Sequence, residues 1–340
     1  MAKKKGEKEA FIDDLANSLV LITSISINLL IVSNIRHLKI DFIVFPFDIL
    51  MLSYIIVFLP IFYILILREK RKIKKGKEIF KNFKQDSSKE LPLKYDIYRK
   101  LTHLVVLAII LFYFTLGFIV QNFFVYLLDF APGFISDIFF SIYNIEKDKM
   151  IFTQYLVVFL VGISLIGLLT ADFVRILKPE QYPLKPVNQI LKEKERYHMR
   201  LGPQISMAVG CFSIIILFGL FQPIGPLIIC ASMTMAIFGD IASNLIGRTI
   251  GTKYKNIRDT NKTYIGLFAG LLISYFSGII FLIILSGFFI LSLLFFFLIP
   301  LIGAFTIGLL DYLDLEVDDN LSFNFLVTSV LFIIAILIGE

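Results

Sequence analysis

A series of long apolar runs, each about 20 residues in length and almost free of charge, constrains this chain more than any other feature. A helix that crosses a bilayer needs roughly 20 apolar residues to span the hydrocarbon core. Hydrophobic residues make up 57% of the 340 residues and charged residues 18%, which excludes a disordered chain and an ordinary soluble domain. We therefore predict an all-α, polytopic membrane protein with about nine transmembrane helices. They are expected near residues 15–35, 43–67, 101–122, 151–175, 204–221, 224–246, 264–285, 287–310 and 322–339.

The stretch 123–143 is also apolar, but Asp129, Pro132, Gly133 and Asp137 interrupt it. Twenty continuous helical residues are not expected there. A re-entrant or interfacial segment that returns to its starting side fits this pattern better.

The distribution of Lys and Arg between the apolar runs predicts the orientation of the chain. With nine spans and the N-terminus in the cytoplasm, 29 of the 33 basic residues fall on the cytoplasmic side and four on the other. Cytoplasmic loops of membrane proteins typically carry an excess of Lys and Arg, so this distribution favours the orientation with the N-terminus in the cytoplasm. The basic loop 68–94 is expected to lie against anionic lipid headgroups.

Ionisable residues lie at the ends of the expected helices rather than in their middles. Asp172, Asp240, Arg99, Lys100 and His103 all fall at cytoplasmic ends in this topology. A transporter is expected to place ionisable groups near the bilayer midplane, at broken helices in two matching halves. No such halves are visible in the sequence. The pattern therefore favours an enzyme that joins a cytosolic substrate to a lipid, with a transporter as the non-enzyme alternative.

Two groups of charged residues each lie at the end of a different expected helix. Arg99, Lys100 and His103 share one helical face, and they either clamp a phosphate or snorkel to lipid headgroups as a basic edge. Asp172 and Arg175 are three residues apart. They form either an interfacial ion pair or part of a site with the basic loop that follows.

The segment 239–251 carries the strongest signal. If it is helical, Asp240, Asn244, Gly247 and Gly251 lie on one stripe. Small residues at this spacing are also typical of a packing face between membrane helices, which explains the glycines but not Asp240 or Asn244. A carboxylate that can hold Mg²⁺, glycines that let phosphate approach the backbone, and nearby cations favour a nucleotide polyphosphate. These cations are Arg248, Lys253 and Lys262.

The segment 311–322 carries five acidic residues and no basic one, on a face that is otherwise rich in Lys and Arg. It is either a solvated acidic turn or a second metal site that uses Asp318, Asp319 and Asn320. Cys211 and Cys230 both fall inside expected spans, so neither a disulfide framework nor a zinc site is predicted from them.

Taken in chain order, these residues resemble the motifs of the CTP-dependent lipid kinase family, which includes dolichol kinases, phytol kinases and CTP-dependent diacylglycerol kinases. The resemblance covers about residues 95–340 and is nearest to polyprenol and dolichol kinases. The chain departs from many members at Ile265, where they have Glu, and at Ser322, where they have Thr. The matching motifs are Arg99-Lys100-x-x-His103, Asp172-x-x-Arg175, Glu195-Arg196 with Gly202, Gly239-Asp240 with Gly247 and Gly251, Lys262-Thr263-x-x-Gly266, and Asp318-Asp319-Asn320-Leu321.

The resemblance implies a membrane-embedded catalytic domain over 95–340, preceded by a two-span extension with a basic cytoplasmic loop over 1–94. It implies transfer of the CTP γ-phosphoryl group to a lipid alcohol, with dolichol or another polyprenol as the expected acceptor. Asp240 or His103 would accept the hydroxyl proton, and Lys262 is the third expected catalytic residue. Mg²⁺ or another divalent cation would be held by Asp240, Asp318, Asp319 and Asn320. The nucleotide would be bound by Arg99, Lys100, Glu195, Asn244, Gly247, Arg248, Gly251, Lys253 and Thr263.

The expected partners are CTP, a lipid alcohol and membrane lipids, and no nucleic acid. Three other functions stay open. The acceptor could be a phytol-like alcohol or diacylglycerol. A CTP:phosphatidate-type cytidylyltransferase would also use CTP, Mg²⁺ and a membrane lipid. In that reaction the lipid would attack the α-phosphate of CTP, and pyrophosphate would be released. A transporter would show no nucleotide turnover.

Overall fold

The computed structural model describes residues 8–34, 43–74, 93–143, 149–185, 187, 191, 200–251, 254–258, 260, 262–287, 291–313, 315 and 317–338. Within these residues the regular structure is helical apart from one isolated β-bridge between Asn256 and Thr263, and turns and short loops join the helices. The longer helices are α2 (Lys8–Asn34), α3 (Phe47–Lys74), α4 (Leu93–Phe114), α5 (Leu116–Leu128), α6 (Gly133–Ile142), α7 (Lys149–Leu177), α9 (Pro203–Phe218), α10 (Ile224–Thr249), α11 (Tyr264–Leu285), α12 (Leu293–Leu313) and α14 (Thr328–Ile338). The short elements are η1 (Pro179–Gln181), α13 (Asp319–Ser322) and the π-helix η4 (Phe323–Val327).

Seven helical segments in the described part of the chain are long and apolar enough to cross a membrane. They are α2, α3, α7, α10, α11, α12 and the continuous segment Asp319–Ile338. The bent pair α4 and α5 adds an eighth candidate if it counts as one span, and α9 is apolar but has only 16 residues. The all-α prediction is confirmed. The count of nine spans and the cytoplasmic N-terminus stay predictions.

The expected continuous span over 101–122 is corrected by a break at Thr115. Helix α4 ends at Phe114, and α5 continues at an angle of 50° to it. Gly117 allows this bend, because a Cβ there would lie 1.9 Å from the Phe112 carbonyl oxygen. A side chain at this position would collide with the preceding helix end.

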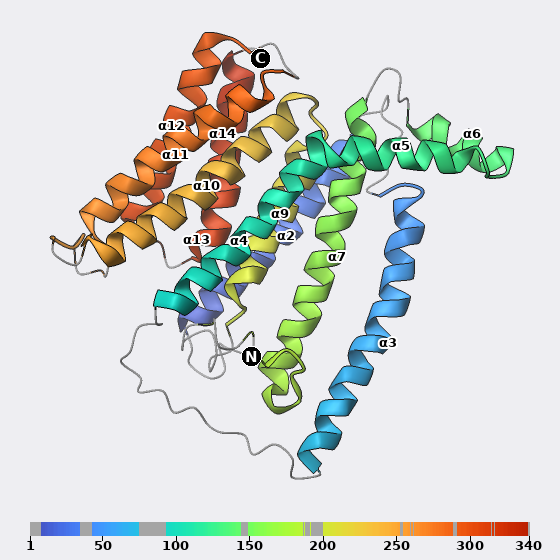
Figure 1. Cartoon of the computed structure of the whole chain (residues 1–340), viewed down its shortest axis with the longest axis horizontal. Helices are drawn as coiled ribbons and strands as arrows, with labels where there is room; N and C mark the ends of the chain where they lie inside the picture. Colours follow the sequence, from blue (N-terminus) through green and yellow to red (C-terminus); the bar gives the residue numbers. More distant parts are fainter. Residues whose placement is uncertain are drawn as a thin grey trace.

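The segment 123–143 forms a helical hairpin, as α5 ends at Leu128 and α6 begins at Gly133. The prediction that it lacks twenty continuous helical residues is confirmed. In Figure 1 both helices run crosswise to α3 and α7, at the end of the molecule opposite the start of α4. Its placement at the membrane interface stays a prediction.

Helix α10 lies at the centre of the fold, where it contacts α4, α9, α11, α12 and α14. Its side chains Ile228, Ile229 and Met233 are fully buried. The outer helices expose large apolar residues instead, for example Leu293 at 78% and Phe305 at 67%. Soluble monomers rarely expose apolar surface of this extent, whereas lipid chains cover it without cost. The burial pattern agrees with a membrane-embedded protein.

The N-terminal helices are packed onto this core. Helix α2 lies along α9, where Asn17 donates a hydrogen bond to Ser206 Oγ and Asn28 donates to the carbonyl oxygen of Ile216. Helix α3 contacts α7 and η1. The division of the chain near residue 95 stays a prediction, and the contacts of α2 and α3 cross it.

Candidate functional site

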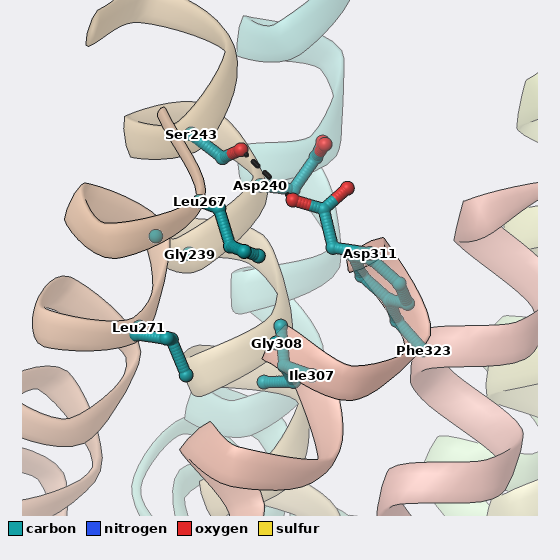
Figure 2. Close-up of a pocket in the computed structure, with 10 residues that line it drawn as sticks. Gly239, Asp240, Ser243, Leu267, Leu271, Ile307, Gly308, Asp311 and Phe323 are labelled. Atoms are coloured by element: carbon teal, nitrogen blue, oxygen red, sulfur yellow. Dashed lines mark hydrogen bonds between the residues drawn. The ribbon is translucent and has the colours of Figure 1, made fainter. Parts of the chain in front are cut away.

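A pocket opens where α10, α11, α12 and η4 meet (Figure 2), and it holds about 230 Å³ of empty space, including the part open to solvent. Two carboxylates, Asp240 from α10 and Asp311 from α12, line its polar side. The space that the centre of a water-sized sphere can reach inside it is only about 10 Å³, which is about enough for one water molecule. The pocket is therefore far smaller than one that encloses a whole small molecule, and it suits a metal ion or the hydroxyl end of a longer molecule. Its lining residues are Gly239, Asp240, Ser243, Leu267, Gly270, Leu271, Ile307, Gly308, Asp311 and Phe323.

The deeper side of the pocket is apolar. Leu267 and Leu271 come from α11, Ile307 comes from α12, and Phe323 comes from η4. In Figure 2 Leu271 and Ile307 lie away from the two carboxylates, so the pocket is acidic at one side and hydrocarbon-like at the other. Such a lining matches a molecule with a polar head and an apolar chain.

Asp311 is the centre of a small polar network. Ser243 donates a hydrogen bond of 3.1 Å to its Oδ2, and Lys262 Nζ lies 2.9 Å from its Oδ1. The same ammonium lies 3.5 Å from Asp319 Oδ2. Asp240 accepts a 2.7 Å hydrogen bond from the Asn244 side chain one turn further along α10. The structure thus brings Asp240, Asn244, Lys262 and Asp319 to one region, as the sequence predicted.

Asp311 itself was not singled out from the sequence. It is part of the acidic segment 311–322, for which the sequence predicts a turn or a metal site, but it belongs to the last turn of α12. The available signal was the cluster of five acids beside a basic face.

The glycines of the segment 239–251 face helix α11 or the turn before it. A Cβ on Gly239 would lie 2.0 Å from Ser274 Oγ, and one on Gly251 would lie 2.3 Å from Thr263 Oγ1. Gly247 faces Thr263 and Gly266. The packing interpretation that the sequence left open therefore accounts for all three glycines. Phosphate binding by Gly247 and Gly251 stays a prediction.

Other motif residues are engaged in helix capping. Thr263 is the N-cap of α11, and its hydroxyl accepts a hydrogen bond from the Gly266 amide. Asp318 is the N-cap of α13, and its Oδ1 accepts hydrogen bonds from the amide and side chain of Asn320. These contacts give Thr263, Asp318 and Asn320 a structural role, and their nucleotide and metal roles stay predictions.

Asp172 and Arg175 form the ion pair that their spacing allowed, and both side chains are buried. Asp172 also accepts a hydrogen bond from the Gly202 amide, so the pair ties α7 to the start of α9. Burial, helped by the Asp172 carboxylate and opposed by Arg175, raises the pKa of Tyr182 to about 12. Tyr182 is buried, and its phenol is therefore neutral at pH 7.

Arg99 and His103 lie one turn apart on α4, which packs against α10, and their exposures are 8% and 6%. Figure 2 shows α4 passing behind Asp240. Arg248 lies in the last turn of α10. Lys253 and Glu195, and the side chain of Lys100, lie outside the described residues.

The site offers only a small number of side chains that could bind Mg²⁺. In the described part of the chain, no group of three or more His, Cys, Asp or Glu side chains is arranged to hold a metal ion. Mg²⁺, however, commonly uses only one or two carboxylates and completes its coordination with water and substrate phosphates. Asp240 and Asp311 fit such a site, because both carboxylates line one pocket.

In its described part, the chain is a helical protein with several membrane-length apolar helices and a small pocket lined by two carboxylates, one of which pairs with Lys262. Comparison with protein-family models, with curated proteins and with solved structures finds no match to this chain.

Proposed function

We propose that this chain is a multi-pass membrane phosphotransferase that moves the γ-phosphoryl group of CTP to a lipid alcohol at the cytoplasmic face. The observation that carries the proposal is the two-sided pocket, in which Asp240 and Asp311 line one side and Leu271 and Ile307 line the other. The motif resemblance supports CTP as the donor and a polyprenol such as dolichol as the acceptor. The distribution of Lys and Arg supports the cytoplasmic side.

Phosphoryl transfer depends mainly on positioning and on neutralising charge. Asp240 and Asp311 would hold the Mg²⁺, which neutralises phosphate charge when it is bound. Lys262, which lies between Asp311 and Asp319, would add a second positive charge. Asp240 or His103 would accept the hydroxyl proton of the alcohol. The apolar side of the pocket would take the first carbons of the lipid chain.

The test is a transfer assay with the purified protein in detergent, Mg²⁺, γ-labelled CTP and a panel of alcohols that includes polyprenols, phytol and diacylglycerol. We expect a labelled lipid phosphate and CDP. In Asp240→Asn we expect kcat to fall by about three orders of magnitude, because the metal loses a charged ligand. The variant keeps an oxygen that can accept the Asn244 hydrogen bond, so the fold should survive.

Asp48→Asn is the matched control, because Asp48 is an exposed carboxylate at the start of α3, outside the pocket. It should turn over like the wild-type protein. Formation of pyrophosphate and a CDP-lipid would indicate the cytidylyltransferase alternative. Absence of turnover with every alcohol, or wild-type turnover by a folded Asp240→Asn protein, would contradict the proposal.

A further inference from the structure

Asp13 stands near the start of α2, outside the part of the chain that carries the motifs, and its side chain is fully buried. Both of its carboxylate oxygens are used. Oδ2 lies 2.9 Å from Arg200 Nε, and Oδ1 accepts a 2.9 Å hydrogen bond from the backbone amide of Asp318. These contacts join residues about 190 and 305 positions apart in the sequence.

Arg200 completes a closed set of contacts. Its Nη2 lies 3.9 Å from Asp318 Oδ2, and its carbonyl oxygen accepts a hydrogen bond from Arg175. A buried carboxylate needs such partners, since leaving it unpaired is costly. Asp13 therefore fixes the backbone of Asp318 relative to α9 as well as to α2.

The segment held by Asp13 leads directly to the pocket. Asp318 caps α13, whose first residue, Asp319, lies 3.5 Å from Lys262 Nζ. The helix continues into η4, and Phe323 at its start lines the pocket. A shift of the Asp318 backbone would move both Asp319 and Phe323.

Helix α2 is suited to act as a fixed support. Its buried polar residues Asp13, Asn17, Ser24 and Asn28 fall on one face, the face that meets α9. Asn17 donates to Ser206 near the start of α9, and Asn28 donates to Ile216 near its end. Polar contacts of this kind hold helices together in a bilayer, where apolar contact alone gives little preference.

We propose that Asp13 is a positioning residue of the pocket, which sets the place of Asp319 and Phe323 through the Asp318 amide and Arg200. This inference rests on the proposed function and adds α2 to the site. The chain over 1–94 would then contribute to turnover.

The test compares Asp13→Asn with Asn28→Ala in the full-length protein. Asn28→Ala removes a buried contact between α2 and α9 about four helical turns away from Asp13. It therefore controls for any general weakening of the packing between these two helices. Two quantities are measured: kcat and KM for CTP in the transfer assay, and hydrogen exchange of the backbone amides over 317–324.

We expect Asp13→Asn to lower kcat by about 10- to 100-fold, because small displacements of catalytic groups cost rates of this order. The change in KM should be smaller, and the amides over 317–324 should exchange faster. Asn28→Ala should leave kcat within about twofold of wild type, and the exchange over 317–324 unchanged. If Asp13→Asn does not fold because Arg200 loses the Asp13 carboxylate, the double variant Asp13→Leu with Arg200→Met removes both charges together.

The inference is overturned if kcat of Asp13→Asn or of the double variant stays within twofold of wild type. It is also overturned if exchange over 317–324 is unchanged, or if Asn28→Ala lowers kcat equally. A wild-type protein without phosphotransfer would overturn the proposed function instead. The exchange comparison between the two variants would then still decide whether Asp13 holds this segment.

Discussion

Substitution of Asp311 is the clearest test of whether the carboxylates of the pocket serve catalysis or only the stability of the fold. Its carboxylate is 12% exposed and lies 2.9 Å from Lys262 Nζ, whose side chain is 27% exposed. Because the lysine of this partly buried pair is exposed enough for water to screen it, the pair contributes on the order of 1 kcal/mol to stability. In Asp311→Asn the amide oxygen can still accept the hydrogen bond from Ser243. We therefore expect the free energy of unfolding to fall by about 1 kcal/mol.

The expected loss of activity is much larger. Removing one preorganised group that stabilises charge in a transition state typically costs about 100- to 1,000-fold in kcat, or about 2.7–4 kcal/mol. If Asp311 holds the metal, Asp311→Asn should lose activity on this scale, an effect at least twice as large in free energy as its loss of stability. The assays are transfer of label from γ-labelled CTP and thermal unfolding in the same detergent.

Glu69→Gln is the matched control for a partly buried ion pair. Glu69 is 10% exposed, and it pairs with Lys72 at 2.7 Å and Lys185 at 3.2 Å at the end of α3. Removing the Glu69 charge should lower the free energy of unfolding about as much as Asp311→Asn does, without changing the rate of phosphate transfer. The reasoning is refuted if folded Asp311→Asn transfers phosphate within threefold of the wild-type rate, or if both variants lose activity in parallel.

Two further predictions concern the residues around the pocket. Lys262→Ala should mainly raise KM for CTP in the transfer assay, because it removes a positive charge beside Asp311 and Asp319; an unchanged KM would reject nucleotide binding by this lysine. Gly239→Ala should lower stability by about 1–3 kcal/mol in thermal unfolding, because its Cβ would meet Ser274 Oγ at 2.0 Å. Gly133→Ala, with nothing within 4 Å of the added carbon, is its control, and equal stability of the two variants would contradict the packing role.

Much of the fold follows from the apolar runs alone, because a bilayer forces each run into a helix whose backbone bonds are satisfied internally. Each of the expected spans contains a helix in the structure. The break at Thr115 could not be predicted, since the residues around it are apolar on both sides. It depends on the close approach of the Phe112 carbonyl to Gly117, a contact that exists only once the helices bend.

The site was predictable to the extent that it uses residues near each other in sequence. Asp240 and Asn244 are one helical turn apart, and their contact follows from that spacing. Lys262, Asp311 and Asp319 come from three separate helix ends, namely the turn before α11, the end of α12 and the start of α13. Only their acidic and basic character indicated that they meet. Asp13 carried no such signal, because its partners Arg200 and Asp318 are distant in sequence and because it lies outside the part of the chain that the motif resemblance covers.

The glycines show why the two interpretations of the segment 239–251 could not be separated from the sequence. Phosphate approach and helix packing both need a backbone without Cβ, so they predict the same residues at the same spacing. In the structure, Ser274 fills the space beside Gly239, and Thr263 fills the space beside Gly251. Under the proposed function, Lys262 and a metal on Asp240 and Asp311 would then neutralise phosphate charge, while phosphate binding by Gly247 and Gly251 stays a prediction. The variants at Asp240, Asp311 and Lys262 should therefore lower activity far more than stability, whereas Gly239→Ala should lower stability first.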